Sequence, residues 1–218
     1  MGYRVRIKIC GITNTADAEQ AAVLGADAVG LNFYPRSPRY LNPAASFTIL
    51  RALPAFVEPV ALFVEQPFRD VFETLNQLGG VRTFQWYGGR RELSDTYPFR
   101  HVPAFPVQDA DSLRAITRYL EMCARIGGLP AAVVVDAAVP GQHGGTGRTV
   151  PWHLLADFRP GVPVILAGGL TPDNVAEAVR VVRPDGVDVA GGVEAAPGRK
   201  DADKMSRFVE AARAAAGL

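Results

Sequence analysis

The chain has 218 residues, of which 48 % are hydrophobic and 21 % are charged. These proportions are typical of a soluble globular protein and exclude a disordered chain. The 23 Lys and Arg residues almost balance the 22 Asp and Glu residues. A net charge of +1 gives no basic surface that would bind nucleic acid or an anionic membrane, so neither is expected as a partner. Lysine occurs only at positions 8, 200 and 204, which we interpret as an effect of genome base composition.

The length fits either one (β/α)8 barrel, which takes roughly 200–250 residues, or two small domains. The two cysteines, Cys10 and Cys123, lie far apart in the sequence and predict neither a disulfide framework nor a zinc site. The sequence has no apolar run of membrane-spanning length, and its start does not read as a signal peptide. We therefore expect a cytoplasmic protein without a membrane anchor.

Short apolar runs alternate with amphipathic stretches along the chain. Strands are predicted to begin near Arg4, Asp27, Val57, Val81, Phe99, Pro130, Val162 and Gly186. Helices are predicted over 15–24, 43–53, 67–78, 110–126, 171–182 and 201–216. The helix from Thr171 is expected to have Thr171 as its cap and Pro172 in its first turn. Segment 88–98 leaves room only for a short, irregular helix.

Strands that alternate with helices predict parallel βαβ units. Eight such units without an intervening linker favour a single closed (β/α)8 TIM barrel over residues 1–218, rather than an open doubly wound sheet. In such a barrel the functional residues follow the carboxyl ends of the strands.

Cys10 ends the first predicted strand. Strand alternation places Arg6, Lys8 and Cys10 on one face, which points into the barrel. A thiol at this end is a candidate nucleophile or proton-transfer base, although a buried cysteine is more often a small packing residue. Cys123 lies on the apolar stripe of a helix and is predicted to pack.

The loop after the second strand contains two prolines and two arginines, Arg36 and Arg39. A guanidinium on a stiff loop can bind a carboxylate through two parallel hydrogen bonds. The alternative is a solvated loop with surface arginines.

Asp136 ends the sixth apolar strand and is followed by a glycine-rich segment that includes His143, Gly144 and Gly145. A partly desolvated carboxyl group at this place is expected to have a raised pKa and to act as a general acid. The glycine-rich segment could close over a ligand, and we interpret His143 as incidental.

Two glycine pairs follow strands seven and eight: Gly168 with Gly169, and Gly191 with Gly192. Glycine lets backbone N–H groups approach an anion closely. The loops after these two strands frequently form a phosphate site in barrels, so a phosphorylated ligand is predicted.

Five segments together resemble the phosphoribosylanthranilate isomerases of tryptophan biosynthesis. They are KICGIT (8–13), NFYPRSPRY (32–40), VVDAAVPGQHGGTG (134–147), ILAGGLTPDNV (165–175) and VDVAGGVEAAPGRKD (187–201). The resemblance implies an Amadori rearrangement of a phosphosugar, N-(5-phospho-β-D-ribosyl)anthranilate, to 1-(2-carboxyphenylamino)-1-deoxy-D-ribulose 5-phosphate. It also implies that no cofactor or metal is used. Members of the family are mostly monomeric, so a monomer is expected.

The same resemblance assigns roles to three residues. Asp136 is the general acid that protonates the ribose ring oxygen, Cys10 is the base that removes the proton from C2, and Arg39 binds the anthranilate carboxylate. For Cys10 to be a thiolate near neutral pH, its pKa has to fall from about 8.5 through nearby positive charge. Lys8 contributes to this field, and we predict that it pairs with Asp188, because barrel closure makes strands one and eight neighbours. The alternative is that Lys8 meets only backbone carbonyls and water.

The chain departs from the family pattern at three places. After strand four the family usually has Gln-Leu-His-Gly, whereas this chain has Gln-Trp-Tyr-Gly, with Tyr87 at the His position. On strand five the family's Lys-Ala is replaced by Pro103-Ala104, and on strand eight a serine of the family is replaced by Ala190. These changes leave open which side chains of strands four and five line the site.

Two alternatives to this function remain. One is another phosphosugar barrel enzyme. Indole-3-glycerol-phosphate synthase works with several lysines, however, whereas this chain has only three. Ribulose-phosphate epimerase binds metal through histidines at strand ends, and besides His101 the sequence shows no evident second histidine for such a site. The other is a catalytically silent phosphosugar-binding paralogue, in which Cys10 or Asp136 would not need to be retained.

Overall fold

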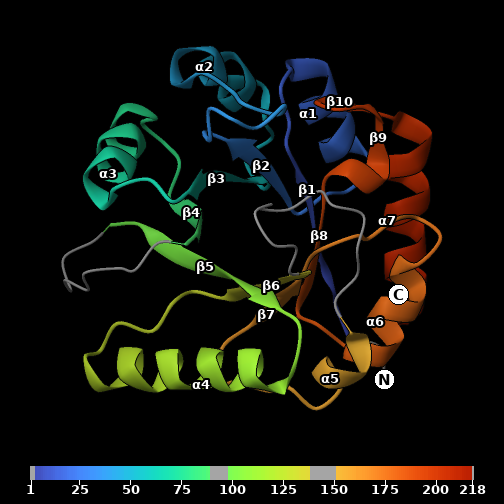
Figure 1. The fold of residues 1–218 in the computed structure, drawn as a ribbon. Helices are drawn as coiled ribbons and strands as arrows, with labels where there is room; N and C mark the ends of the chain where they lie inside the picture. Colours follow the sequence, from blue (N-terminus) through green and yellow to red (C-terminus); the bar gives the residue numbers. More distant parts are fainter. Residues whose placement is uncertain (1–2, 89–97, 138–150, 218) are drawn as a thin grey trace.

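The computed structural model describes residues 3–88, 98–137 and 151–217. Eight parallel strands form a closed barrel in the order of the sequence, and helices surround it (Figure 1). The strands are β1 (Arg6–Cys10), β2 (Ala28–Asn32), β3 (Glu58–Val64), β4 (Thr83–Tyr87), β5 (Arg100–Val107), β6 (Val133–Ala137), β7 (Val164–Leu166) and β8 (Gly186–Val189). This confirms the predicted fold class.

Six of the seven helices in the described residues correspond to predicted helices, and the short helix over residues 152–155 was not predicted. They are α1 (Thr15–Val23), α2 (Pro43–Ala52), α3 (Phe68–Gln77), α4 (Ala110–Arg125), α5 (Trp152–Leu155), α6 (Val175–Val182) and α7 (Ala202–Ala216). Side-chain caps fix the starts of four of them, where Asn14, Asn42, Asp109 and Asp201 each accept a backbone N–H of the first turn. The irregular helix expected over 88–98 falls almost wholly on residues 89–97, which lie outside the described residues.

Helix α6 begins at Val175, four residues later than predicted. Thr171 and Pro172 open a turn instead, because the Asn174 side chain ties this segment together. Its Oδ1 accepts from the Thr171 N–H at 2.8 Å, and its Nδ2 donates to the Gly169 carbonyl at 2.9 Å. The turn therefore fixes the backbone directly after the Gly168–Gly169 pair.

A short hairpin that the sequence pattern did not predict lies between β8 and α7. A 3-10 turn, η1 (Gly191–Val193), leads into β9 (Glu194–Ala196), which pairs antiparallel with β10 (Arg199–Lys200). The Asp201 N–H donates to the Val193 carbonyl at 2.9 Å and returns the chain to the end of β8. The hairpin thereby brings Glu194 and Lys200 to the carboxyl end of the barrel.

Strand β1 closes the barrel against β8 in a register that places Lys8 opposite Asp188. Residues Ile7 and Ile9 of β1 belong to the large apolar core shared with the helices, whereas Cys10 belongs to a smaller cluster inside the barrel. The predicted alternation therefore holds for Lys8 and Cys10, and Arg6 is exposed at the opposite end of the strand. Cys123 is fully buried on α4 and packs as predicted.

Candidate active site

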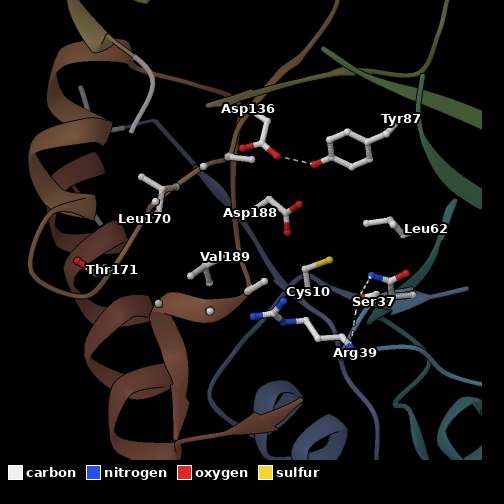
Figure 2. A pocket seen from close by; sticks show the side chains of 17 residues that line it. Cys10, Ser37, Arg39, Leu62, Tyr87, Asp136, Leu170, Thr171, Asp188 and Val189 are labelled. Carbon is white, nitrogen blue, oxygen red and sulfur yellow. Dashed lines mark hydrogen bonds between the residues drawn. The ribbon is translucent and has the colours of Figure 1, made fainter. Parts of the chain in front are cut away.

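A cavity of about 380 Å³ lies at the carboxyl ends of the strands (Figure 2). The walls come from β1, β2, β3, β4, β6 and β8 and from the loops after β2, β7 and β8. Among the lining residues are Cys10, Arg39, Tyr87, Asp136, Gly168, Gly169, Asp188, Gly191 and Gly192. Every described residue that the family resemblance assigned a role, and every residue of the two glycine pairs after strands seven and eight, thus lines one cavity. The remaining two, Gly144 and Gly145, lie outside the described residues, as does His143.

Asp136 projects into the cavity from the end of β6 and is 4 % exposed. Its Oδ2 accepts a hydrogen bond from the Tyr87 hydroxyl at 2.7 Å (Figure 2). Its Oδ1 is buried and has no hydrogen-bond partner within the described part of the chain. Burial raises the pKa of Asp136, and the hydrogen bond from Tyr87 lowers it only in part. The direction agrees with the sequence prediction, and a carboxyl group in this state can hold and donate a proton.

Lys8 and Asp188 form the predicted ion pair inside the barrel. Lys8 Nζ lies 2.8 Å from Asp188 Oδ2, and both side chains are almost wholly buried. Burial lowers the pKa of Lys8, but Asp188 and Cys10 raise it by more, so the ammonium stays charged. The alternative in which Lys8 meets only carbonyls and water is therefore wrong.

The pKa of Cys10 does not fall as the sequence analysis expected. Burial raises the pKa of this thiol, and the charges of Lys8 and Lys200 lower it only in part. The expectation counted the nearby lysine but not the cost of removing a thiolate from water. In the protein without ligand, Cys10 therefore holds its proton more firmly than an ordinary cysteine.

Space for the Cys10 thiol comes from Gly30, its register partner on β2. A Cβ atom at Gly30 would lie 2.6 Å from Cys10 Sγ and 3.1 Å from Lys8 Nζ. A larger residue at this position would displace the thiol and the ammonium together, a constraint that sequence reasoning missed.

Arg39 does not lie on a solvated loop, because its guanidinium is bound to the buried Glu194. The Nε and Nη2 atoms lie 2.8 and 2.7 Å from the two carboxylate oxygens. The stem of Arg39 crosses Gly11, which has φ +74° and whose missing Cβ would collide with Arg39 Cδ. Arg36, the other arginine of this loop, is exposed.

Glu194 and Lys200 are site residues that the sequence analysis did not single out. The Lys200 ammonium donates to Glu194 Oε1 at 2.8 Å and to the Cys10 carbonyl at 2.6 Å. Lys204 donates to the Glu194 carbonyl, and Lys8 pairs with Asp188. All three lysines of the chain thus bind acceptors around the junction of β1 and β8.

The glycine pairs let the loops after β7 and β8 pack closely against each other and against Asp136. Gly168 has φ +87°, and a Cβ there would collide with the Ala137 backbone N–H and lie 2.6 Å from Asp136 Oδ1. A Cβ at Gly192 would overlap the Leu170 carbonyl. Both loops therefore present bare backbone to the cavity.

Within residues 3–88, 98–137 and 151–217, the structure shows no group of three or more His, Cys, Asp or Glu side chains placed to hold a metal ion. His101 is buried and stacks on Phe84 with ring centroids 4.9 Å apart, away from the cavity residues. Among the helices of these residues, none combines the length and the hydrophobicity needed to cross a membrane.

A buried carboxyl group, a buried thiol and an arginine at the carboxyl face of a closed eight-stranded barrel define a (β/α)8-barrel enzyme that works by proton transfer. Comparison with known families narrows this class. The family model described as N-(5'-phosphoribosyl)anthranilate (PRA) isomerase matches residues 7–211. The chain belongs to this family.

Curated relatives and solved structures agree with the family. The chain is 45 % identical over 211 residues to the N-(5'-phosphoribosyl)anthranilate isomerase of Geobacter metallireducens, which covers 96 % of this chain and 100 % of the relative. Against the isomerase of Acidithiobacillus ferrooxidans the identity is 46 %, with coverages of 96 % and 98 %.

The crystal structure of the Thermotoga maritima isomerase superposes with a TM-score of 0.84 at 33 % identity, covering 99 % of this chain and 100 % of that one. Another solved isomerase, in complex with reduced 1-(o-carboxyphenylamino)-1-deoxyribulose 5-phosphate, gives a TM-score of 0.82 at 32 % identity with the same coverage.

Proposed function

We propose that this protein converts N-(5-phospho-β-D-ribosyl)anthranilate to 1-(2-carboxyphenylamino)-1-deoxy-D-ribulose 5-phosphate, the isomerase step of tryptophan biosynthesis. The observation that carries the proposal is the convergence of Asp136, Cys10 and Arg39 on one cavity of a chain from this family. A relative of the same fold binds a reduced form of the product.

Asp136 begins the reaction as the general acid. It gives its proton to the ribose ring oxygen, the bond from C1 to that oxygen breaks, and the nitrogen lone pair forms the C1=N bond of a Schiff base. Because Oδ2 is held by the Tyr87 hydroxyl, Oδ1 is the oxygen that carries the proton to be transferred. The raised pKa of Asp136 favours the protonated form that this step requires.

Cys10 continues the reaction as the base. It removes the proton from C2, the electrons of that C–H bond form C1=C2, and the nitrogen regains its lone pair in an enolamine. Transfer of a proton to C1 and loss of one from the C2 hydroxyl give the ketone. In Figure 2 Cys10 lies on the opposite side of the cavity from Asp136, with Asp188 between them. The charges of Lys8 and Lys200 favour the thiolate that the step needs.

Binding of the substrate uses its two negatively charged ends. Arg39 takes the anthranilate carboxylate. The phosphate lies against backbone N–H groups of Gly168, Gly169, Gly191 and Gly192, and Gly144 and Gly145 are assigned to the substrate by family resemblance. Because Ala190 lacks a hydroxyl group, backbone amides carry the phosphate contact here.

The test is a turnover assay with the substrate made in situ, comparing wild type with Cys10→Ala and Asp136→Asn. We expect turnover by wild type and a loss of about 10²–10⁴-fold in either variant, the usual contribution of a general acid or base. Binding without turnover by wild type would establish the silent phosphosugar-binding paralogue. Variants that match wild type would remove the assigned acid and base.

We further propose that the protein acts as a monomer in the cytoplasm, without cofactor or metal. The acid, the base and Arg39 all come from the same chain, which supports a site that needs no second copy. Light scattering at assay concentration tests this, and a dimer mass would contradict it.

A further inference from the structure

The guanidinium of Arg39 has two edges that can each grip a carboxylate, and only one of them is occupied by Glu194. Nε and Nη2 bind the two oxygens of Glu194. A guanidinium has five N–H donors in a rigid fork, so Nη1 and the second N–H of Nη2 form another two-pronged edge. Arg39 lines the cavity, and this second edge is the part of it that can take a ligand carboxylate.

Glu194 is itself held rigidly. Its side chain is 4 % exposed, and Oε1 accepts from Lys200 Nζ at 2.8 Å and from the Gly198 N–H at 3.3 Å. Burial raises the pKa of Glu194, but the hydrogen bonds from Arg39 and Lys200 lower it by more. The group therefore remains a carboxylate and keeps its two bonds to Arg39.

Lys200 connects this carboxylate to the rest of the site. Besides Glu194, its fully buried ammonium donates to the Cys10 carbonyl at 2.6 Å and to the Ala190 carbonyl at 3.2 Å. One cation thus ties Glu194 to the end of β1, which carries the thiol, and to the end of β8, which precedes the second glycine pair.

The cluster formed by Arg39, Glu194 and Lys200 carries a net positive charge. Arg39 and Lys200 carry two positive charges and Glu194 one negative charge, so a bound carboxylate would neutralise the cluster. A competing acceptor lies in the same cavity, because Asp188 Oδ1 is buried without a hydrogen-bond partner among the described residues. Without Glu194, the Arg39 guanidinium would lose both hydrogen bonds that fix its orientation.

We propose that Glu194 and Lys200 are positioning residues for carboxylate recognition. Glu194 occupies one edge of Arg39 so that the other edge faces the anthranilate carboxylate, and Lys200 braces Glu194 against the backbone of Cys10 and Ala190. The proposal rests on the proposed function, because that function supplies the carboxylate.

The test compares two ligands by calorimetry. One is the reduced product analogue, and the other is the same molecule without the ortho-carboxylate on its ring. Wild type is expected to prefer the carboxylate form, and Glu194→Gln to lower this preference about tenfold, the value of one charge-assisted hydrogen bond. Affinity for the ligand without the carboxylate should stay within about twofold. Glu73→Gln, which removes a carboxylate from an exposed ion pair on α3, is the matched control and should leave both affinities unchanged.

The sign of the change decides the proposal. Glu194→Gln removes a negative charge near the ligand carboxylate, so electrostatics alone would strengthen the preference. An increased or unchanged preference in Glu194→Gln, or an equal loss for both ligands, would overturn the positioning role. A wild type without any preference would contradict the proposed function instead.

Lys200→Met provides a second test that leaves the neutral Arg39–Glu194 pair intact, and it decides the proposal if Glu194→Gln does not fold. We expect a weaker preference for the carboxylate ligand together with a lower kcat, because the Cys10 carbonyl loses its anchor. A variant with wild-type preference and kcat would show that Lys200 has no positioning role.

Discussion

Tyr87 replaces the histidine that the family usually has after strand four, and it holds the acid in place. Its hydroxyl donates to Asp136 Oδ2, and Gln85 Nε2 donates to the Tyr87 oxygen at 3.2 Å. Burial and the charge of Asp136 raise the pKa of Tyr87 well above its ordinary value, so the hydroxyl keeps its proton. The departure from the family pattern therefore leaves a donor on Asp136.

Tyr87→Phe is expected to raise the pKa of Asp136 further, because a hydrogen bond that favours the carboxylate is lost. Activity should fall about tenfold as the carboxyl group loses its fixed orientation. Carbon NMR of labelled aspartate measures the pKa, with Asp136→Asn identifying the resonance. Tyr87→His, which restores a donor of the family type, should recover part of the activity. An unchanged Asp136 pKa in Tyr87→Phe would refute this role.

The pKa of the Cys10 thiol is expected to lie above that of an ordinary cysteine, because burial outweighs the charges of the nearby lysines. The pH dependence of alkylation by iodoacetamide measures this, and Cys10→Ala gives the background from the buried Cys123. The double variant Lys8→Met, Asp188→Asn keeps the barrel interior neutral. It should raise the Cys10 pKa further, since Lys8 lowers it by more than Asp188 raises it. A midpoint below the ordinary value in wild type would contradict the prediction.

Strand alternation was enough to predict that Lys8 and Cys10 point into the barrel, and barrel closure was enough to pair Lys8 with Asp188. Asp136 was found by a different signal, its place at the end of the sixth apolar run. These signals could not predict Glu194 or Lys200, which follow η1 in a short hairpin without periodicity. The direction of the Cys10 pKa shift could not be predicted either, because it depends on a balance between burial and charge that no sequence pattern contains.

At the scale of elements, the loop after β7 can take its path because its glycines have no Cβ atom. Gly168 and Gly161 have nearly the same backbone angle, φ +87° and +84°, but only Gly168 has close neighbours. A Cβ at Gly161 would meet nothing within 4 Å, whereas one at Gly168 would press on Asp136 and Ala137. Substitutions at these two positions therefore distinguish the cost of a left-handed backbone from the cost of crowding Asp136.

Gly161→Ala is therefore expected to lower the free energy of unfolding by roughly 1–2 kcal/mol, the cost of a left-handed conformation, and to keep full activity. Gly168→Ala should lose more stability than that and most of its activity, because it displaces the acid. Urea unfolding and the turnover assay measure the two effects. Equal behaviour of the two variants would show that the loop does not crowd Asp136.

Element boundaries were predicted less well than element order. The order of strands and helices follows from hydrophobic periodicity, but the start of α6 depends on one side chain, Asn174, that closes a turn before the helix. The hairpin of β9 and β10 is too short to show a period. Both lie beside the cavity, where local hydrogen bonds determine the path of the chain.

At the scale of the whole molecule, the barrel carries a carboxyl group that works against its stability. The pKa of Asp136 is raised in the folded protein, so its contribution to stability is fully present below the unfolded-state pKa of about 3.9. The contribution is lost as the pH rises through the folded-state pKa. At neutral pH the raised pKa of Asp136 therefore lowers the stability of the fold.

Asp136→Asn is accordingly expected to raise the free energy of unfolding at neutral pH, because the amide carries no charge that burial penalises. The gain should shrink as the pH falls toward 4, because wild type then also carries a neutral group. Asp109, which caps α4, is the control of opposite sign. Hydrogen bonds from Ser112 lower the pKa of Asp109, so Asp109→Asn should lose stability at neutral pH. Urea unfolding at both pH values measures the differences. An inactive Asp136→Asn that is no more stable than wild type would show that Asp136 costs the fold nothing.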